Sequence, residues 1–163
     1  MSTNAQENPM AGFRLEDFLP YKLVIVTDGV SRVFAGNLLE SFNLTIPEWR
    51  ILAVVAEQGT LSPTATAART AMDKVKVSRA AQSLAAKGLL RQSADPRDGR
   101  GRLLRLTRKG NTTHAAIVPL ATRLESTLFD DLTRADMAAL NRVLAKIATR
   151  VETIGASAED GEE

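Results

Sequence analysis

The sequence predicts a mainly α-helical fold that carries one small β-hairpin. Apolar residues recur every three or four positions over most of the chain, which is the spacing of one helix face. Residues 89–106 instead hold two short strand-like runs separated by turn residues. The 163 residues, 44% of them hydrophobic, suffice for the core of one ordinary domain.

Composition excludes several classes of function. The chain has no cysteine, which excludes disulfides, thiolate metal sites and cysteine-based redox sensing, and its single histidine, His114, argues against a zinc site. No nucleophile–histidine–acid set, metal cluster or phosphate-cradling glycine loop is present, so we expect no enzyme activity and no cofactor. No run of about 18 apolar residues exists and the N-terminus is polar, so we expect a cytoplasmic protein without a membrane span or secretory signal.

Basic residues are concentrated in one block. Between Arg69 and Gly110 there are twelve lysines and arginines against three aspartates, a balance of +9 in a chain whose net charge is only +2. Lysine and arginine displace the counterions condensed on nucleic-acid phosphates. The block therefore predicts a surface for a polyanion, and composition alone leaves an ordinary solvated face as the alternative.

Two helices are expected first. The apolar repeat predicts a helix over residues 19–42. A second helix begins at Thr45, which can cap it, carries Pro47 in its first turn and ends at Gly59. Its expected apolar stripe consists of Trp49, Leu52, Ala53 and Ala56.

The next two helices are short and follow each other closely. Ser62 and Pro63 form a start signal for a helix that ends near Thr70, and a turn at 71–73 follows. A helix over 74–87 then ends at Gly88. Its predicted buried face consists of Val77, Ala80, Ala81 and Leu84. Two short helices joined by a tight turn are typical of a helix-turn-helix, whose second helix enters the major groove of DNA.

A hairpin with a basic tip follows. Residues 89–93 and 102–106 read as strands, and the connection over 94–101 contains the turn dipeptides Asp95-Pro96 and Asp98-Gly99. A winged helix-turn-helix has such a hairpin as its wing.

Two long helices close the chain. Thr107 opens the first of them, and we expect Pro119 to kink or split it. Thr133, with Asp136 three residues later, resembles a capping box for the last helix. That helix carries a near-heptad apolar stripe of Met137, Leu140, Val143, Leu144, Ile147, Val151 and Ile154. A stripe of this kind needs a partner helix.

From about residue 15 to residue 154, this order of parts resembles the MarR family of bacterial regulators. Residues 44–52 (LTIPEWRIL) are similar to the family's second-helix signature, and residues 72–80 (MDKVKVSRA) to the entry of its recognition helix. Residues 88–90 and 106–110 match the boundaries of its wing.

The resemblance implies a two-fold dimer with one compact domain per chain. The domain would span 15–155, with a DNA-binding lobe at about 45–110 and dimerisation helices at about 15–43 and 111–155. Composition predicts a disordered arm at 1–14 and a disordered acidic tail at 156–163.

The family also implies that Asp98 orients Arg100 for the minor groove. Gly99 stands between them where the family usually carries arginine, and Arg102 can supply part of the missing charge.

The predicted DNA contacts fall into three groups. Side chains of the recognition helix can contact base edges or phosphates: Lys74, Lys76, Ser78, Arg79 and Gln82. Thr64 and Thr66 can donate to phosphate, with simple capping as the equal alternative. The wing contributes Arg97, Asp98, Arg100 and Arg102, of which Arg97 and Arg100 suit a narrow minor groove. An ordinary solvated surface is the alternative for the recognition helix and the wing tip.

The resemblance further implies a small aromatic or phenolic effector between the dimer helices and the DNA-binding lobe. The candidates are Tyr21, Trp49, Arg50 and His114, with core packing as the alternative for Trp49. We therefore expect a homodimeric repressor of a palindromic double-stranded DNA site, released by a small ligand. A constitutive or architectural DNA-binding protein without an effector is the alternative.

Overall fold

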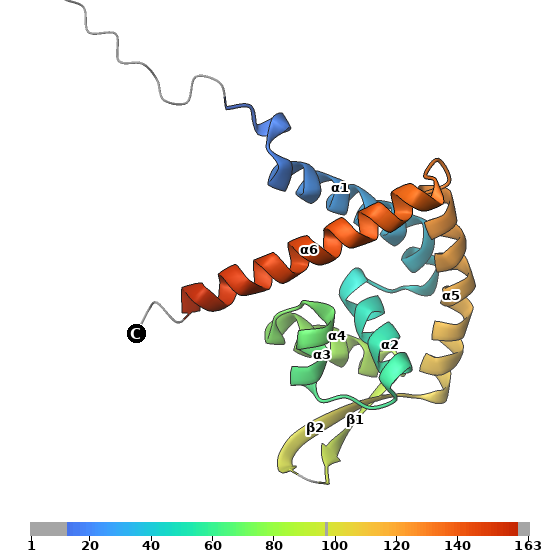
Figure 1. Cartoon of the computed structure of the whole chain (residues 1–163). Coiled ribbons are helices and arrows are strands. Elements are labelled where there is room, and N and C mark those ends of the chain that lie inside the picture. Colours follow the sequence, from blue (N-terminus) through green and yellow to red (C-terminus); the bar gives the residue numbers. More distant parts are fainter. Residues whose placement is uncertain (1–12, 97, 160–163) are drawn as a thin grey trace, which may run out of the picture. The chain divides into compact units, whose positions relative to one another are not determined.

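The computed structural model describes residues 13–96 and 98–159 (Figure 1). It divides into two compact units, one up to Ala121 and one from Thr122 onward. Residues 1–12, Arg97 and residues 160–163, which include most of the predicted arm and half of the predicted tail, lie outside the described residues. In the described part of the chain, no helix combines the length and the hydropathy needed to cross a membrane.

The first predicted helix is helical throughout but changes its winding. After the 3-10 turn η1 (Leu15–Asp17), α1 (Leu19–Phe34) passes into the π-helical turn η2 (Ala35–Leu39) and the 3-10 turn η3 (Glu40–Phe42). The π-helical turn η2 is wound more widely than an α-helix, and two consecutive residues in it, Leu38 and Leu39, are buried in the core. Asn43, in the left-handed conformation with φ of 53°, ends the segment.

Helix α2 (Ile46–Gln58) begins and ends as predicted. Thr45 and Glu48 form a reciprocal capping box, and Gly59 ends the helix with φ of 77°. Its buried apolar face consists of Ile51, Leu52 and Val55. Of the predicted stripe, Leu52 is buried, whereas Trp49, Ala53 and Ala56 are half-buried. The fully buried face of α2 packs on α3, α4 and β2 and lies roughly 100° around the helix from the predicted stripe.

The helix-turn-helix consists of α3 (Pro63–Thr70) and α4 (Lys74–Ala86). Ser62 caps α3 by accepting the N–H of Ala65 at 3.1 Å, and Ala71, with φ of 51°, provides the turn. The buried apolar face of α4 consists of the four predicted residues, Val77, Ala80, Ala81 and Leu84.

The hairpin consists of β1 (Leu90–Asp95) and β2 (Asp98–Leu106) and projects from the helices α2–α4 (Figure 1). Both strands reach further toward the tip than predicted, because the ladder continues through Ala94–Arg102 to Asp95–Asp98 across an irregularity at Ala94/Asp95. At its base, the backbone of Leu104 exchanges hydrogen bonds of 3.1 and 2.7 Å with Leu61.

Helices α5 (Arg108–Leu128) and α6 (Arg134–Glu159) complete the chain. Pro119 was predicted to kink or split its helix; α5 continues through it, so the split does not occur, and a kink there stays a prediction. Pro119 and Ala115, whose carbonyl loses its helical partner, are both exposed, so water can satisfy that carbonyl. The Thr133–Asp136 capping box is confirmed by three hydrogen bonds of 2.6–3.2 Å. Helix α6 includes residues 156–159, which were predicted to belong to the disordered tail; the Ser157 hydroxyl there bonds the carbonyl of Thr153.

Candidate DNA interface and effector cluster

Helix α4 has one face in the core and one face in solvent. The five polar side chains predicted to meet DNA are all exposed: Lys74, Lys76, Ser78, Arg79 and Gln82. The opposite face is fixed by Val77 and Leu84, both 0% exposed. The helix is thus held rigidly from behind while its polar side is free to enter a groove.

The N-terminus of α4 is capped by Asp73, whose carboxylate accepts the Lys76 N–H at 2.7 Å and pairs with Lys76 Nζ at 3.3 Å. The backbone hydrogen bond from Lys76 is the main cause that lowers the pKa of Asp73. The exposed Arg79 lies about one turn further along α4. Lys76 and Arg79 both line a pocket of about 290 Å³ beside Thr45 and Pro47.

The two threonines of α3 that were predicted to contact DNA, Thr64 and Thr66, differ in exposure. Thr64 is exposed in the first turn, where a hydroxyl can meet a phosphate. Thr66 is completely buried, and its hydroxyl donates to the Ser62 carbonyl at 2.9 Å. The prediction that Thr66 contacts DNA was wrong, because its position in the helix turns it toward the core.

A buried ion pair joins the end of α4 to the start of α2. Lys87 Nζ lies 2.7 and 2.9 Å from the carboxylate oxygens of Glu48, whose side chain is only 3% exposed, and it also donates to the Asn43 carbonyl at 2.6 Å. Burial alone would raise the pKa of Glu48, but hydrogen bonds from Lys87, Ser83 and Thr45 outweigh it and lower that pKa. Sequence analysis did not find this pair, because its partners lie 39 positions apart.

The start of α5 is bonded to the same end of α4. Thr107 accepts the Gly110 N–H and donates its hydroxyl to the Gly88 carbonyl at 2.7 Å. The Thr107 N–H donates to the Leu89 carbonyl at 3.0 Å, and Lys109 Nζ donates to the Lys87 carbonyl at 2.9 Å. Three hydrogen bonds, from Thr107 to Gly88 and Leu89 and from Lys109 to Lys87, therefore join the two chain segments at the base of the hairpin.

The predicted wing contacts are placed only in part. Arg97 lies outside the described residues, and only the backbone of Asp98 and Arg100 is described, within β2. The predicted orientation of Arg100 by Asp98 therefore stays a prediction. Arg102 is exposed, and its guanidinium donates to the Gln92 amide oxygen at 3.4 Å across the ladder.

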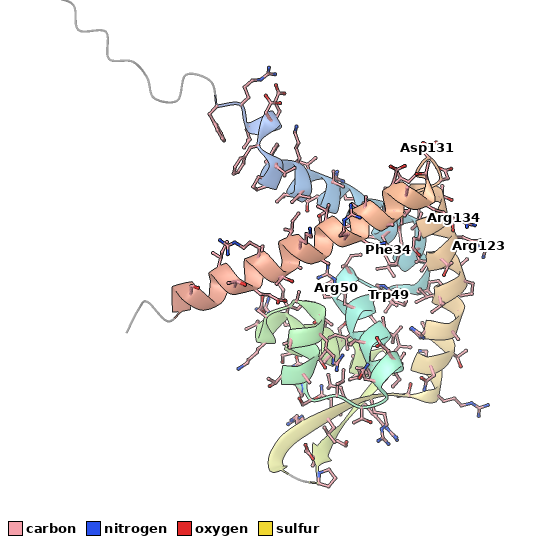
Figure 2. The ribbon with its side chains drawn as sticks, viewed as in Figure 1. Phe34, Trp49, Arg50, Arg123, Asp131 and Arg134 are labelled. Atoms are coloured by element: carbon pink, nitrogen blue, oxygen red, sulfur yellow. The ribbon has the colours of Figure 1, made fainter. Side chains whose placement is uncertain are left out.

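Three rings from three segments form a cluster in the first unit. The His114 ring of α5 stacks on Trp49 of α2, with centroids 5.7 Å apart and planes 17° apart, and Phe34 of α1 lies 6.0 Å from Trp49 (Figure 2). Burial lowers the pKa of His114, which favours a neutral ring at pH 7. Sequence analysis named Trp49 and His114 but not Phe34, which only its place at the end of α1 brings here.

Arg50 and Tyr21 take different positions. Arg50 donates to the Thr70 carbonyl at 3.4 Å and, together with Trp49, lines a pocket of about 350 Å³ that Glu57 and Arg69 also line. Tyr21 is exposed on α1 and, among the described residues, makes no ring contact with the cluster. Trp49 thus stacks on His114 and shares a pocket with Arg50.

The chain is similar to known regulators over most of its length. A model of the MarR family matches residues 42–101, which cover α2 to β2. The transcriptional repressor IacR of Pseudomonas putida is 27% identical over 142 residues, 87% of this chain and 84% of IacR.

Solved structures show the same fold. BpsR of Bordetella bronchiseptica, whose DNA binding is described as regulated by 6-hydroxynicotinic acid, matches with a TM-score of 0.74 and 27% identity over 80% of this chain and 98% of BpsR. A mutant MarR of Escherichia coli in complex with operator DNA matches with a TM-score of 0.75 and 22% identity over 83% of this chain and 99% of that one. Together with the helix-turn-helix and the hairpin, these likenesses show that the chain resembles the DNA-binding transcriptional regulators of the MarR family in sequence and in fold.

Proposed function

We propose that the protein is a homodimeric repressor that acts in the cytoplasm. In this proposal α4 reads the major groove of a palindromic site, the hairpin contacts the adjacent minor groove, and a small aromatic ligand releases the DNA. The observation that carries the proposal is the exposed polar face of α4, backed by a fully buried apolar face. IacR, a relative by sequence, is a repressor, which supports repression here.

Apolar surface on the outer helices supports the dimer. On α1, Leu19 and Val26 are 62% and 63% exposed, and on α6, Val151 and Ile154 are 63% and 57% exposed. Leaving apolar surface in water costs about 25 cal/mol per Å², so a second copy that covers these faces would be stabilised. Sedimentation should give twice the chain mass of 17.6 kDa, and a monomer at the concentrations that bind DNA would contradict the dimer.

A selection from random duplexes should first identify the palindromic site that the wild type binds. Replacing Arg79 by alanine should weaken binding to that site by about 5- to 150-fold, the equivalent of about 1–3 kcal/mol. The reason is the loss of a paired hydrogen bond to a base edge or a phosphate. Anisotropy titrations with a fluorescent duplex at several salt concentrations measure this. Loss of a base contact relaxes sequence preference, whereas loss of a phosphate contact lowers the salt slope by about one.

Arg123→Ala is the matched control for that experiment, since Arg123 is an exposed arginine of α5 outside the predicted contact set (Figure 2). It should bind like the wild type. If Arg79→Ala also binds like the wild type, α4 is not the reading helix. If the wild type selects no sequence at all, the proposed repressor is wrong and an architectural DNA-binding role takes its place.

The aromatic cluster supports a planar ligand with a carboxylate. Trp49 and His114 offer ring faces, and the Arg50 guanidinium beside the pocket can pair with a carboxylate. Such a ligand releases DNA only if it binds the DNA-incompetent state of the dimer more tightly than the competent one.

Because Trp49 is the only tryptophan, its fluorescence reports on this site directly. Benzene and pyridine carboxylates, including 6-hydroxynicotinic acid, should change that fluorescence saturably and weaken DNA binding. Arg50→Gln should weaken binding of the carboxylates more than that of the matching phenols. If no compound changes either signal, the protein is a constitutive DNA binder without an effector.

A further inference from the structure

Two arginines lie opposite each other on the outer face of the hairpin. Arg91 of β1 and Arg105 of β2 are direct partners in the antiparallel ladder, so their side chains leave the same face of the sheet. Both are exposed, whereas the neighbouring pair Leu90 and Leu106 is buried on the opposite face. Like charges directly opposite each other destabilise a hairpin. This arrangement needs a physical reason other than the stability of the fold.

The two arginines line a pocket, and a hydrogen bond holds one of them in place. Arg105 Nε donates to Thr60 Oγ1 at 2.9 Å, and Thr60 is held because the next residue, Leu61, pairs with the backbone of Leu104. A pocket of about 410 Å³ lies here, lined by Thr60, Arg91, Ser93 and Arg105 among others. Among the side chains that the structure describes, those of residues 13–96, 101–155 and 157, no ion pair with a carboxylate involves Arg91 or Arg105.

We propose that this pocket, which we call the Arg91–Arg105 pocket, binds a phosphate group. The planar guanidinium forks match the oxygen geometry of a phosphate, and a phosphate placed between them would turn their mutual repulsion into attraction. The hydroxyls of Ser93 and Thr60 add uncharged hydrogen-bonding groups at the rim. The phosphate comes either from the DNA backbone beyond the groove that the hairpin contacts or from a free phosphate or phosphomonoester.

Titration of the isotope-labelled full-length protein with inorganic phosphate tests the pocket without DNA. In nuclear magnetic resonance spectra at constant pH and ionic strength, the Thr60 and Ser93 amides and the Arg105 Nε signal should shift saturably. Arg91→Gln and Arg105→Gln should each weaken this binding at least tenfold, while Arg123→Gln leaves it unchanged. Equal shifts with chloride would reveal general screening and count against a phosphate site.

Titration with DNA then shows whether the phosphate group in the Arg91–Arg105 pocket comes from the DNA backbone or from a free phosphate. Two duplexes are compared, one that ends at the groove contacted by the hairpin and one that extends about one helical turn further. If the phosphate belongs to DNA, Arg91→Gln weakens binding only to the longer duplex and lowers the salt slope by about one. If the variant binds both duplexes like the wild type but has lost inorganic phosphate, the source is a free phosphate.

If neither phosphate nor the longer duplex distinguishes the variants from the wild type, the proposal is overturned. The phosphate titration does not depend on the proposed repressor function. Failure of the repressor would appear as loss of sequence-selective DNA binding by the wild type, and the two failures can therefore be told apart.

Discussion

Replacing Gly110 by alanine is expected to lower the free energy of unfolding by about 3 kcal/mol or more. A Cβ atom at this position would overlap the carbonyl oxygen of Leu89 and come within 3.4 Å of the Leu106 side chain. The obstacle is backbone that cannot yield, because the Leu89 carbonyl accepts the Thr107 N–H and the Leu89 N–H donates to Leu84. The added methyl group must therefore push α5 away from the base of the hairpin.

Urea denaturation followed by circular dichroism, at fixed protein concentration, measures this loss. Gly155→Ala in α6 is the matched control, because nothing lies within 4 Å of the new Cβ. It should leave stability unchanged or raise it by about 0.5–1 kcal/mol, since alanine favours a helix interior. A Gly110→Ala protein within about 1 kcal/mol of the wild type would show that α5 does not approach Leu89 this closely.

The second large effect is expected for Lys87→Met, at about 3 kcal/mol. The methionine removes the ammonium group and leaves the Glu48 carboxylate buried without its charged partner. This value is the lower end of the range measured when one partner of a buried ion pair is removed. We take the lower end because the Lys87 side chain is 26% exposed. The same change frees the last turn of α4 from α2, so DNA affinity should fall as well.

The pH dependence of the free energy of unfolding distinguishes the loss of the ion pair from a general packing defect. The pKa of Glu48 is lowered in the folded protein, so its contribution is present above the ordinary carboxyl pKa and is lost as the pH falls through the lowered value. Without the Lys87 hydrogen bond, burial of Glu48 is less well offset and its pKa should be higher in Lys87→Met than in the wild type. The stability difference between the two proteins should therefore begin to shrink above the ordinary carboxyl pKa and continue to shrink as the pH falls through the lowered wild-type value. A difference that stays constant from pH 7 downward would contradict the ion-pair account. Lys74→Met, at an exposed lysine of the same helix, should change stability by less than about 0.5 kcal/mol.

Local signals account for most of what the sequence predicted. Thr45, the Ser62-Pro63 step and Gly88 mark helix ends through bonds within a few residues, so their effect is visible without tertiary structure. The buried face of α4 followed because Val77, Ala80, Ala81 and Leu84 repeat at helical spacing, although Val75 is apolar and exposed. In α2 apolar residues occupy several sides, and only packing decided that Ile51 and Val55 face the core.

The candidate sites were predictable to the extent that they lie on one element. The exposed residues of α4 share a helix face and were found together, whereas Phe34 joins Trp49 and His114 only through the meeting of three segments. Thr66 was misplaced because Ser62 and Pro63 revealed where α3 begins but not which side of it packs inward. The Arg91–Arg105 pairing depends on strand register, which the sequence did not specify.

The hydrogen bonds of Thr107 and Lys109 to the end of α4 have a consequence for the kind of DNA that the protein prefers. They fix the hairpin at its base, so the distance between α4 and the hairpin cannot adapt freely to a bound duplex. A duplex with a different groove width or twist must then deform to touch both, at an energy that depends on its local stiffness. The protein is expected to discriminate between sites by duplex flexibility at base pairs that it does not touch. Affinities for operators that differ only in those base pairs measure this discrimination.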